Sequence, residues 1–137
     1  AYVTAYPTER GWEVEAFFRA LFAGAKARAE ARGYVLSPHW LHRVGMNGTR
    51  FGEILWARQI RGILFNPSPN YGTRLELPWD KFSVVAHGLS LAHPIFHRTT
   101  TPDTLPQYLH ITQIANWLFY QCSGYSRGKS RVICRNL

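Results

Sequence analysis

The chain has 137 residues, of which 46% are hydrophobic and 18% charged, and its formal net charge is +8. This length predicts one domain with a substantial core, and five Trp, seven Tyr and eight Phe are too many aromatic side chains for a disordered chain. No run of 18 apolar residues predicts a transmembrane helix, and the first residues lack the basic and apolar regions of a signal peptide.

Strand and helix patterns alternate along the chain. Short apolar runs bounded by turn residues predict strands over 1–6, 34–41, 62–67, 83–88 and 94–99, with a last strand from residue 131. Apolar residues at helical spacing, beginning with Val14, predict a long amphipathic helix over 13–32 that ends at Gly33. Further helices are expected over 49–59 and 105–122, and a single helical turn over 77–82.

This alternation predicts an α/β fold with a mostly parallel sheet flanked by helices. The strand over 62–67 is apolar until its end, as is typical of a strand that is buried on both faces of a parallel sheet. Ligands of such sheets bind at the carboxyl ends of the strands, near a topological switch point. The residues at the ends of the first four strands include Thr8, Trp40, Asn66 and His87.

The sequence offers little for catalysis or metal binding. It has no phosphate-binding glycine loop and no GxSxG motif. The histidine pairs His39/His42 and His93/His97 lie beside prolines, away from a regular helix, so no zinc site is expected. No pair of carboxylates converges in a recognisable acid/base pattern. We therefore expect no catalytic residue, no metal and no cofactor.

Basic side chains are scattered, with one group in the helix over 13–32 and another over 127–135. They fit either solvated faces or an anion-binding patch, and both interpretations stay open. Cys122 and Cys134 match neither a zinc motif nor a redox motif and are expected to be buried thiols in a reducing cytosol.

Several aromatic residues lie in or beside the predicted loops, namely Trp12, Trp40, Tyr71 and Trp79. Flat aromatic faces with a few well-placed polar groups are typical of sugar-binding clefts. Packing at the edge of the domain would equally explain each of these residues when it is taken singly.

Four segments, taken in order, resemble the effector-binding module of the lactose-repressor/galactose-repressor family of bacterial transcriptional regulators. They are the end of the long helix with the start of the next strand (23–34), the apolar strand with the residues before it (57–67), the strand that ends in a glycine (77–88), and the turn after the last helix (124–127).

The resemblance implies that residues 1–137 form the first of two subdomains of a periplasmic-binding-protein-like fold, without the DNA-binding headpiece and the second subdomain. It implies a cytoplasmic sensor rather than an enzyme. The effector of this sensor is expected to be a sugar or sugar derivative that binds between the two subdomains, and the sensor would contact DNA through its headpiece. The candidate ligand-binding residues are Thr8, Trp12, Trp40, Asn66 and His87.

In this family the first subdomains pair side by side through the helix after the second strand, which implies a homodimer. The corresponding residues are Phe51, Leu55 and Trp56, with the stretch 68–77. Trp56 points about 100° away from Leu55 on a helix and is expected to be partly exposed. The alternative is that the chain over 70–79 folds onto Trp56 within one subunit.

Three other functions remain open. A solute-binding protein of a sugar transporter would need a signal peptide. A small α/β enzyme would need a converging nucleophile or an acid/base pair. A direct nucleic-acid binder would use the basic residues near the C-terminus, and its affinity would depend on salt.

Overall fold

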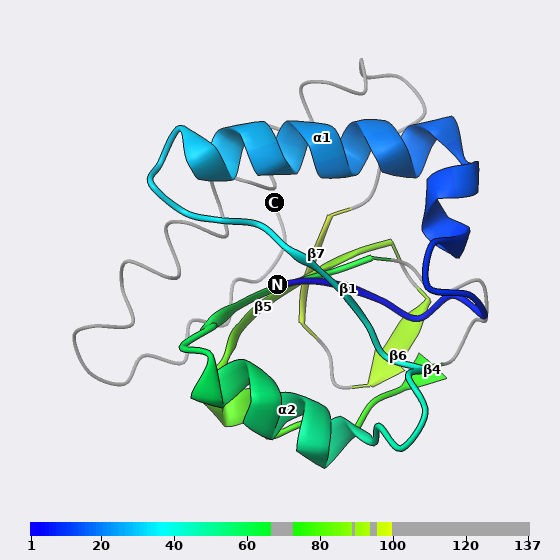
Figure 1. The fold of residues 1–137 in the computed structure, drawn as a ribbon, viewed down its shortest axis with the longest axis vertical. Coiled ribbons are helices and arrows are strands. Elements are labelled where there is room, and N and C mark those ends of the chain that lie inside the picture. The colour runs from blue at the N-terminus through cyan, green and yellow to red at the C-terminus, as the bar shows by residue number, and fades with distance from the viewer. Residues whose placement is uncertain (67–72, 89, 94–95, 100–137) are drawn as a thin grey trace.

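The computed structural model describes residues 1–66, 73–88, 90–93 and 96–99. Its main sheet has five strands in the order β2-β1-β3-β5-β7, and every described pairing in it is parallel (Figure 1). The strands are β1 (Tyr2–Thr4), β2 (Pro38–Trp40), β3 (Gly62–Phe65), β5 (Ser83–His87) and β7 (His97–Thr99). The expected α/β class with a mostly parallel sheet is confirmed.

Two helices cover opposite faces of this sheet (Figure 1). Helix α1 (Ala16–Glu30) connects β1 to β2, and α2 (Gly48–Ala57) connects β2 to β3. Because β2 and β3 pair with opposite sides of β1, the chain reverses its direction across the sheet at β1. Two right-handed crossovers that run in opposite directions place their helices on opposite faces. The switch point therefore lies between β1 and β3.

Alternate residues of the strands build the two cores, as the period of a strand requires. The core on the α2 side includes Val3, Ile63, Phe65 and Val84, packed with Phe51 and Leu55 of α2. The core on the α1 side includes Tyr2, Tyr6, Leu64 and Val85, packed with Trp12 and with Leu21 of α1.

The predicted helix over 13–32 is two elements. A 3₁₀ turn, η1 (Gly11–Val14), precedes α1, and Glu15 between them is extended, with φ −86° and ψ 124°. The break turns Trp12 into the core against Tyr2, with ring centroids 5.2 Å apart. Arg19 then donates to the carbonyl groups of Glu13 and Val14 and so satisfies backbone acceptors beside the break.

Other boundaries also differ from the predictions. The strand expected over 34–41 pairs only over Pro38–Trp40, because Gly33 ends the helical segment in a left-handed conformation and Val35 is 86% exposed. A second, two-stranded parallel sheet joins β4 (Thr73–Arg74) to β6 (Leu91–His93), and the sequence predicted neither strand. The helical turn expected over 77–82 is the 3₁₀ turn η2 (Trp79–Lys81).

The helix predicted over 105–122, the strand expected from residue 131 and both cysteines lie outside the described residues. Within the part of the chain that is described, no helix has the length and apolar character that a membrane span requires.

Candidate functional site at the carboxyl edge of the sheet

Four polar or amphipathic residues lie at one level across four neighbouring strands. Thr4 of β1 is in register with Trp40 of β2. On the other side, Val3 pairs with Phe65 and Phe65 with Ala86, so Asn66 falls between Thr4 and His87. Because residues in register on parallel strands share a face, we call Trp40, Thr4, Asn66 and His87 the polar row. It lies on the α1 side of the sheet, at its carboxyl edge.

Asn66 is the centre of this row. Its backbone N–H donates to the carbonyl of Val3 at 2.8 Å, which continues the pairing of β3 with β1. Its side chain is fully buried, yet neither the amide oxygen nor the amide nitrogen has a hydrogen-bond partner among the described residues. Leaving such a group unpaired costs about 1–3 kcal/mol, so the residue calls for a functional explanation.

His87 closes one end of the row. It is 5% exposed, and its ring lies 5.5 Å from that of Phe17 near the start of α1. Thr4, next to Asn66, is 1% exposed, and its hydroxyl reaches the His39 carbonyl only at 3.5 Å, the long limit of a hydrogen bond.

A pocket of about 350 Å³ opens beside the other end of the row. Thr4 and Trp40 of the row line it, together with Trp12 of η1. The indole N–H of Trp40 donates to the Tyr6 carbonyl at 2.8 Å, which fixes the orientation of that ring. Trp12 is held by Tyr2 and by Phe22, whose ring centroid lies 5.1 Å from that of Trp12. The pocket therefore has two aromatic residues, each held by a defined contact.

The charged side chains at this pocket have partners of opposite charge. Arg10 and Glu13 form an ion pair with a shortest N–O distance of 2.6 Å, and hydrogen bonds from Arg10 lower the pKa of Glu13. Glu9 faces Arg43 at 3.9 Å. A site whose carboxylates and guanidinium groups already balance has no strong preference for a charged ligand.

The five predicted ligand-binding residues divide into three groups. Trp12 and Trp40 line the pocket, and Asn66 and His87 belong to the polar row. Thr8 is exposed, and its carbonyl accepts from the Gly11 N–H in the loop before η1, outside the pocket lining. Sequence reasoning missed Thr4, because a threonine inside a short apolar strand gives no signal of its own.

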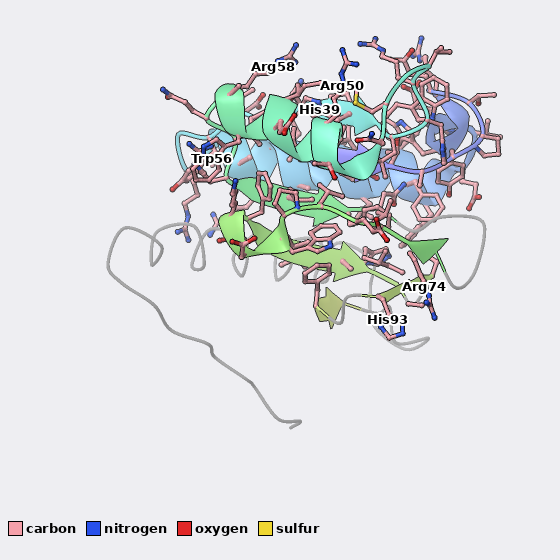
Figure 2. The ribbon with its side chains drawn as sticks, turned by 90° about the horizontal axis from the view of Figure 1, so that it is seen from below. His39, Arg50, Trp56, Arg58, Arg74 and His93 are labelled. Atoms are coloured by element: carbon pink, nitrogen blue, oxygen red, sulfur yellow. The ribbon has the colours of Figure 1, made fainter. Side chains whose placement is uncertain are left out.

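Two of the three residues expected at a dimer interface belong to the core. Phe51 is 3% and Leu55 0% exposed, because both face the sheet from α2. Their side chains are therefore not available to a partner, which corrects the expectation for these two positions. Trp56 is 40% exposed, as expected, and lies near one end of α2 in Figure 2.

The chain also partly covers the face of α2 that Trp56 shares with Gly52. Pro78 packs onto Gly52, and the ring of Phe82 lies 6.3 Å from that of Trp56 in an edge-on arrangement. The guanidinium carbon of Arg61 lies over the Trp56 ring, 3.5 Å from its centroid. Trp56 thus contacts Phe82 and Arg61 of its own chain, both outside the stretch 70–79, and it stays 40% exposed.

The histidines do not gather into a metal centre within the described ranges, where no group of three potential metal ligands occurs. The His39 ring nitrogen Nε2 lies 3.0 Å from the Ser37 hydroxyl, and Nε2 of His42 lies 3.1 Å from the Ala5 carbonyl. His93 is exposed, and its register partner in the small sheet is Arg74 (Figure 2).

No known protein family, no curated protein and no solved structure matches this chain.

Proposed function

We propose that this chain is the ligand-sensing subdomain of a DNA-binding transcriptional regulator, with a periplasmic-binding-protein-like fold. Its carboxyl edge supplies one wall of a site for a neutral, hydroxyl-rich effector such as a sugar. Two things support this: the resemblance of four ordered segments to the lactose-repressor/galactose-repressor family, and the position of the polar row at the switch point of a parallel sheet.

The observation that carries the proposal is the unpaired amide of Asn66. An amide offers one acceptor and two donors. A hydroxyl group both donates and accepts, so a sugar hydroxyl can satisfy the Asn66 oxygen, and a neighbouring hydroxyl the nitrogen. Because the free protein leaves both atoms unsatisfied, ligand binding removes a cost that folding alone does not remove.

The pocket at the Thr4–Trp40 end of the polar row favours the same class of ligand. The indole rings of Trp12 and Trp40 offer apolar faces to the C–H face of a sugar ring. Arg10 pairs with Glu13, and Glu9 faces Arg43, so each of these charges has an opposite partner. We propose binding rather than catalysis as the role of this site.

In the complete regulator, the effector would bind between this subdomain and a second one. If the effector binds one arrangement of the two subdomains more tightly than the other, it shifts the equilibrium between the DNA-competent and DNA-incompetent forms of the regulator. Contact with DNA would belong to a headpiece, and the regulator would act in the cytoplasm as a homodimer.

The proposal is tested by isothermal titration calorimetry with glucose, galactose and ribose, and with glucose 6-phosphate as a charged analogue. At least one neutral sugar should bind, and glucose 6-phosphate should bind more weakly than glucose. Asn66→Leu, which keeps the side-chain shape but removes both polar atoms, should weaken binding at least tenfold. Thr8→Val is the matched control outside the pocket and should bind as the parent does. Failure of every neutral sugar, or unchanged binding by Asn66→Leu, would contradict the proposal.

A further inference from the structure

A second pocket, also of about 350 Å³, lies at the opposite, amino edge of the sheet. It opens between the last turn of α1 and the segment that follows α2. Most of its walls are apolar, formed by Ala29, Tyr34, Val35, Leu36, Ile60 and Leu64. β1 and β3 run from this edge to the polar row, so the two pockets lie at opposite ends of the same two strands.

The backbone around this second pocket is already satisfied. After α1, the N–H of Tyr34 donates to the Ala29 carbonyl at 2.9 Å, and Gly33 is left-handed with φ 78°. After α2, the N–H of Ile60 donates to the Leu55 carbonyl at 2.9 Å, and Gln59 is left-handed with φ 59°. Backbone hydrogen bonds of this kind close the end of each helix beside the pocket. The rim is preformed, and its apolar walls do not need backbone contacts from a ligand.

Two cationic groups belong to residues that line this pocket: the guanidinium of Arg61 and the N-terminal ammonium of Ala1, which donates to the Gly62 carbonyl at 2.6 Å. The central carbon of the Arg61 guanidinium lies 3.5 Å from the centroid of the Trp56 ring, which is outside the pocket lining, and Nη1 donates to the Trp56 carbonyl at 2.9 Å. These contacts fix the guanidinium plane and use one of its two terminal nitrogens. Among the described residues, no carboxylate forms an ion pair with Arg61. A positioned guanidinium without an acidic partner can still donate two hydrogen bonds to a carboxylate.

We propose that this pocket binds a small amphipathic carboxylate, with its hydrocarbon part against Leu36, Ile60 and Leu64 and its carboxylate on Arg61. The site is independent of the effector site at the carboxyl edge and goes beyond the proposed function. The pocket volume falls in the range of small-molecule sites. The net charge of +8 adds a general attraction for anions.

The test uses octanoate and its neutral analogue octan-1-ol as probes of the full chain, followed by ¹H–¹⁵N NMR. Octanoate should shift the amide signals of Leu36 and Gly62 and leave those of Thr4 and Asn66 unchanged. It should bind at least tenfold more tightly than octan-1-ol. This comparison needs no variant. Equal affinities, shifts confined to the carboxyl edge, or absence of binding at millimolar octanoate would each overturn the proposal.

Variants then assign the charge preference. Arg61→Gln should reduce the preference for octanoate over octan-1-ol at least threefold, whereas Arg61→Lys, which keeps the charge, should retain more of it. Arg58→Gln removes one exposed positive charge outside the pocket lining and should leave both affinities unchanged. Because Asn66→Leu changes only the carboxyl edge, this variant should bind octanoate as the parent does. The proposed sugar site and the proposed carboxylate site are therefore tested independently.

Discussion

Pro78 packs against the backbone of Gly52 so closely that a Cβ atom at position 52 would lie 2.6 Å from the proline Cδ. Gly52 is buried in the middle of α2, where glycine is otherwise unfavourable. The contact explains why glycine is required there: it lets the segment before η2 lie directly on the helix. This segment partly covers the face of α2 on which Trp56 lies.

Gly52→Ala should therefore lower the free energy of unfolding by about 1–2 kcal/mol. Overpacking against the rigid proline ring costs about 1–3 kcal/mol, and the better helix propensity of alanine returns up to about 1 kcal/mol. Urea denaturation measures the difference. Thr49→Ala, at an exposed position of the same helix, should change the stability by less than about 0.5 kcal/mol. A neutral or stabilising Gly52→Ala would mean that Pro78 does not pack at this distance.

Gln59→Gly should stabilise the protein by about 0.5–1 kcal/mol. Gln59 has a left-handed backbone, with φ 59°, which glycine adopts without steric cost. Arg58→Gly, one residue earlier at φ −82°, is the matched substitution and should instead destabilise, because it only adds freedom to the unfolded chain. Thermal unfolding of both variants distinguishes the two effects, and equal melting temperatures would contradict the assigned conformation.

His39 should make stability depend on pH between about 6.5 and 4. Desolvation, together with the positive charges of the N-terminus and of Arg58, lowers the pKa of His39 to about 4. The neutral form is therefore favoured in the folded state, and this contribution is present above pH 6.5 and lost as the pH falls toward 4. Since the group is only partly buried, we expect a loss of about 1 kcal/mol over this range.

An NMR titration of the His39 ring checks this directly. Arg58→Gln removes one of the charges that oppose protonation, so it should raise the pKa of His39 toward its ordinary value. A His39 pKa near 6.5 in the parent protein would show that the ring is not desolvated as described.

Self-association through Trp56 remains a prediction. If this indole is the anchor of a homodimer, Trp56→Ala should weaken association by about 2 kcal/mol or more. Sedimentation equilibrium of the parent and the variant measures this quantity. A monomeric parent, or a variant with an unchanged dimer constant, would show that Trp56 serves only its own subunit, through Arg61 and Phe82.

The sequence predicted the parallel sheet because helical segments alternate with strand segments, some of which are apolar runs such as Ile63–Phe65 that a polar residue follows at once. Asn66 and His87 were found for the same reason, since each directly follows or ends such a run. Thr4 could not be found, because its role depends on register with Asn66. The family resemblance placed Phe51 and Leu55 at a dimer interface, whereas the helical periodicity over 49–59 places them on the inward face, where both are buried.

The short strands β4 and β6 illustrate another limit. A pairing of two or three residues depends on contacts between segments distant in sequence, and Thr73 and Leu91 carry no local pattern that predicts it. In the same way, helical periodicity from Val14 onward hid the break at Glu15, which the packing of Trp12 against Tyr2 and Phe22 favours.

The most direct test of the central claim measures the stability of Asn66→Leu by urea denaturation, with and without a neutral sugar that binds the parent. Without sugar, the variant should be more stable than the parent by about 1–2 kcal/mol, because an unpaired buried amide is replaced by an apolar group of the same shape. The sugar should stabilise the parent and leave the variant unchanged. A variant that is less stable without sugar, or that gains as much from the sugar as the parent does, would contradict the assignment of Asn66 to the ligand.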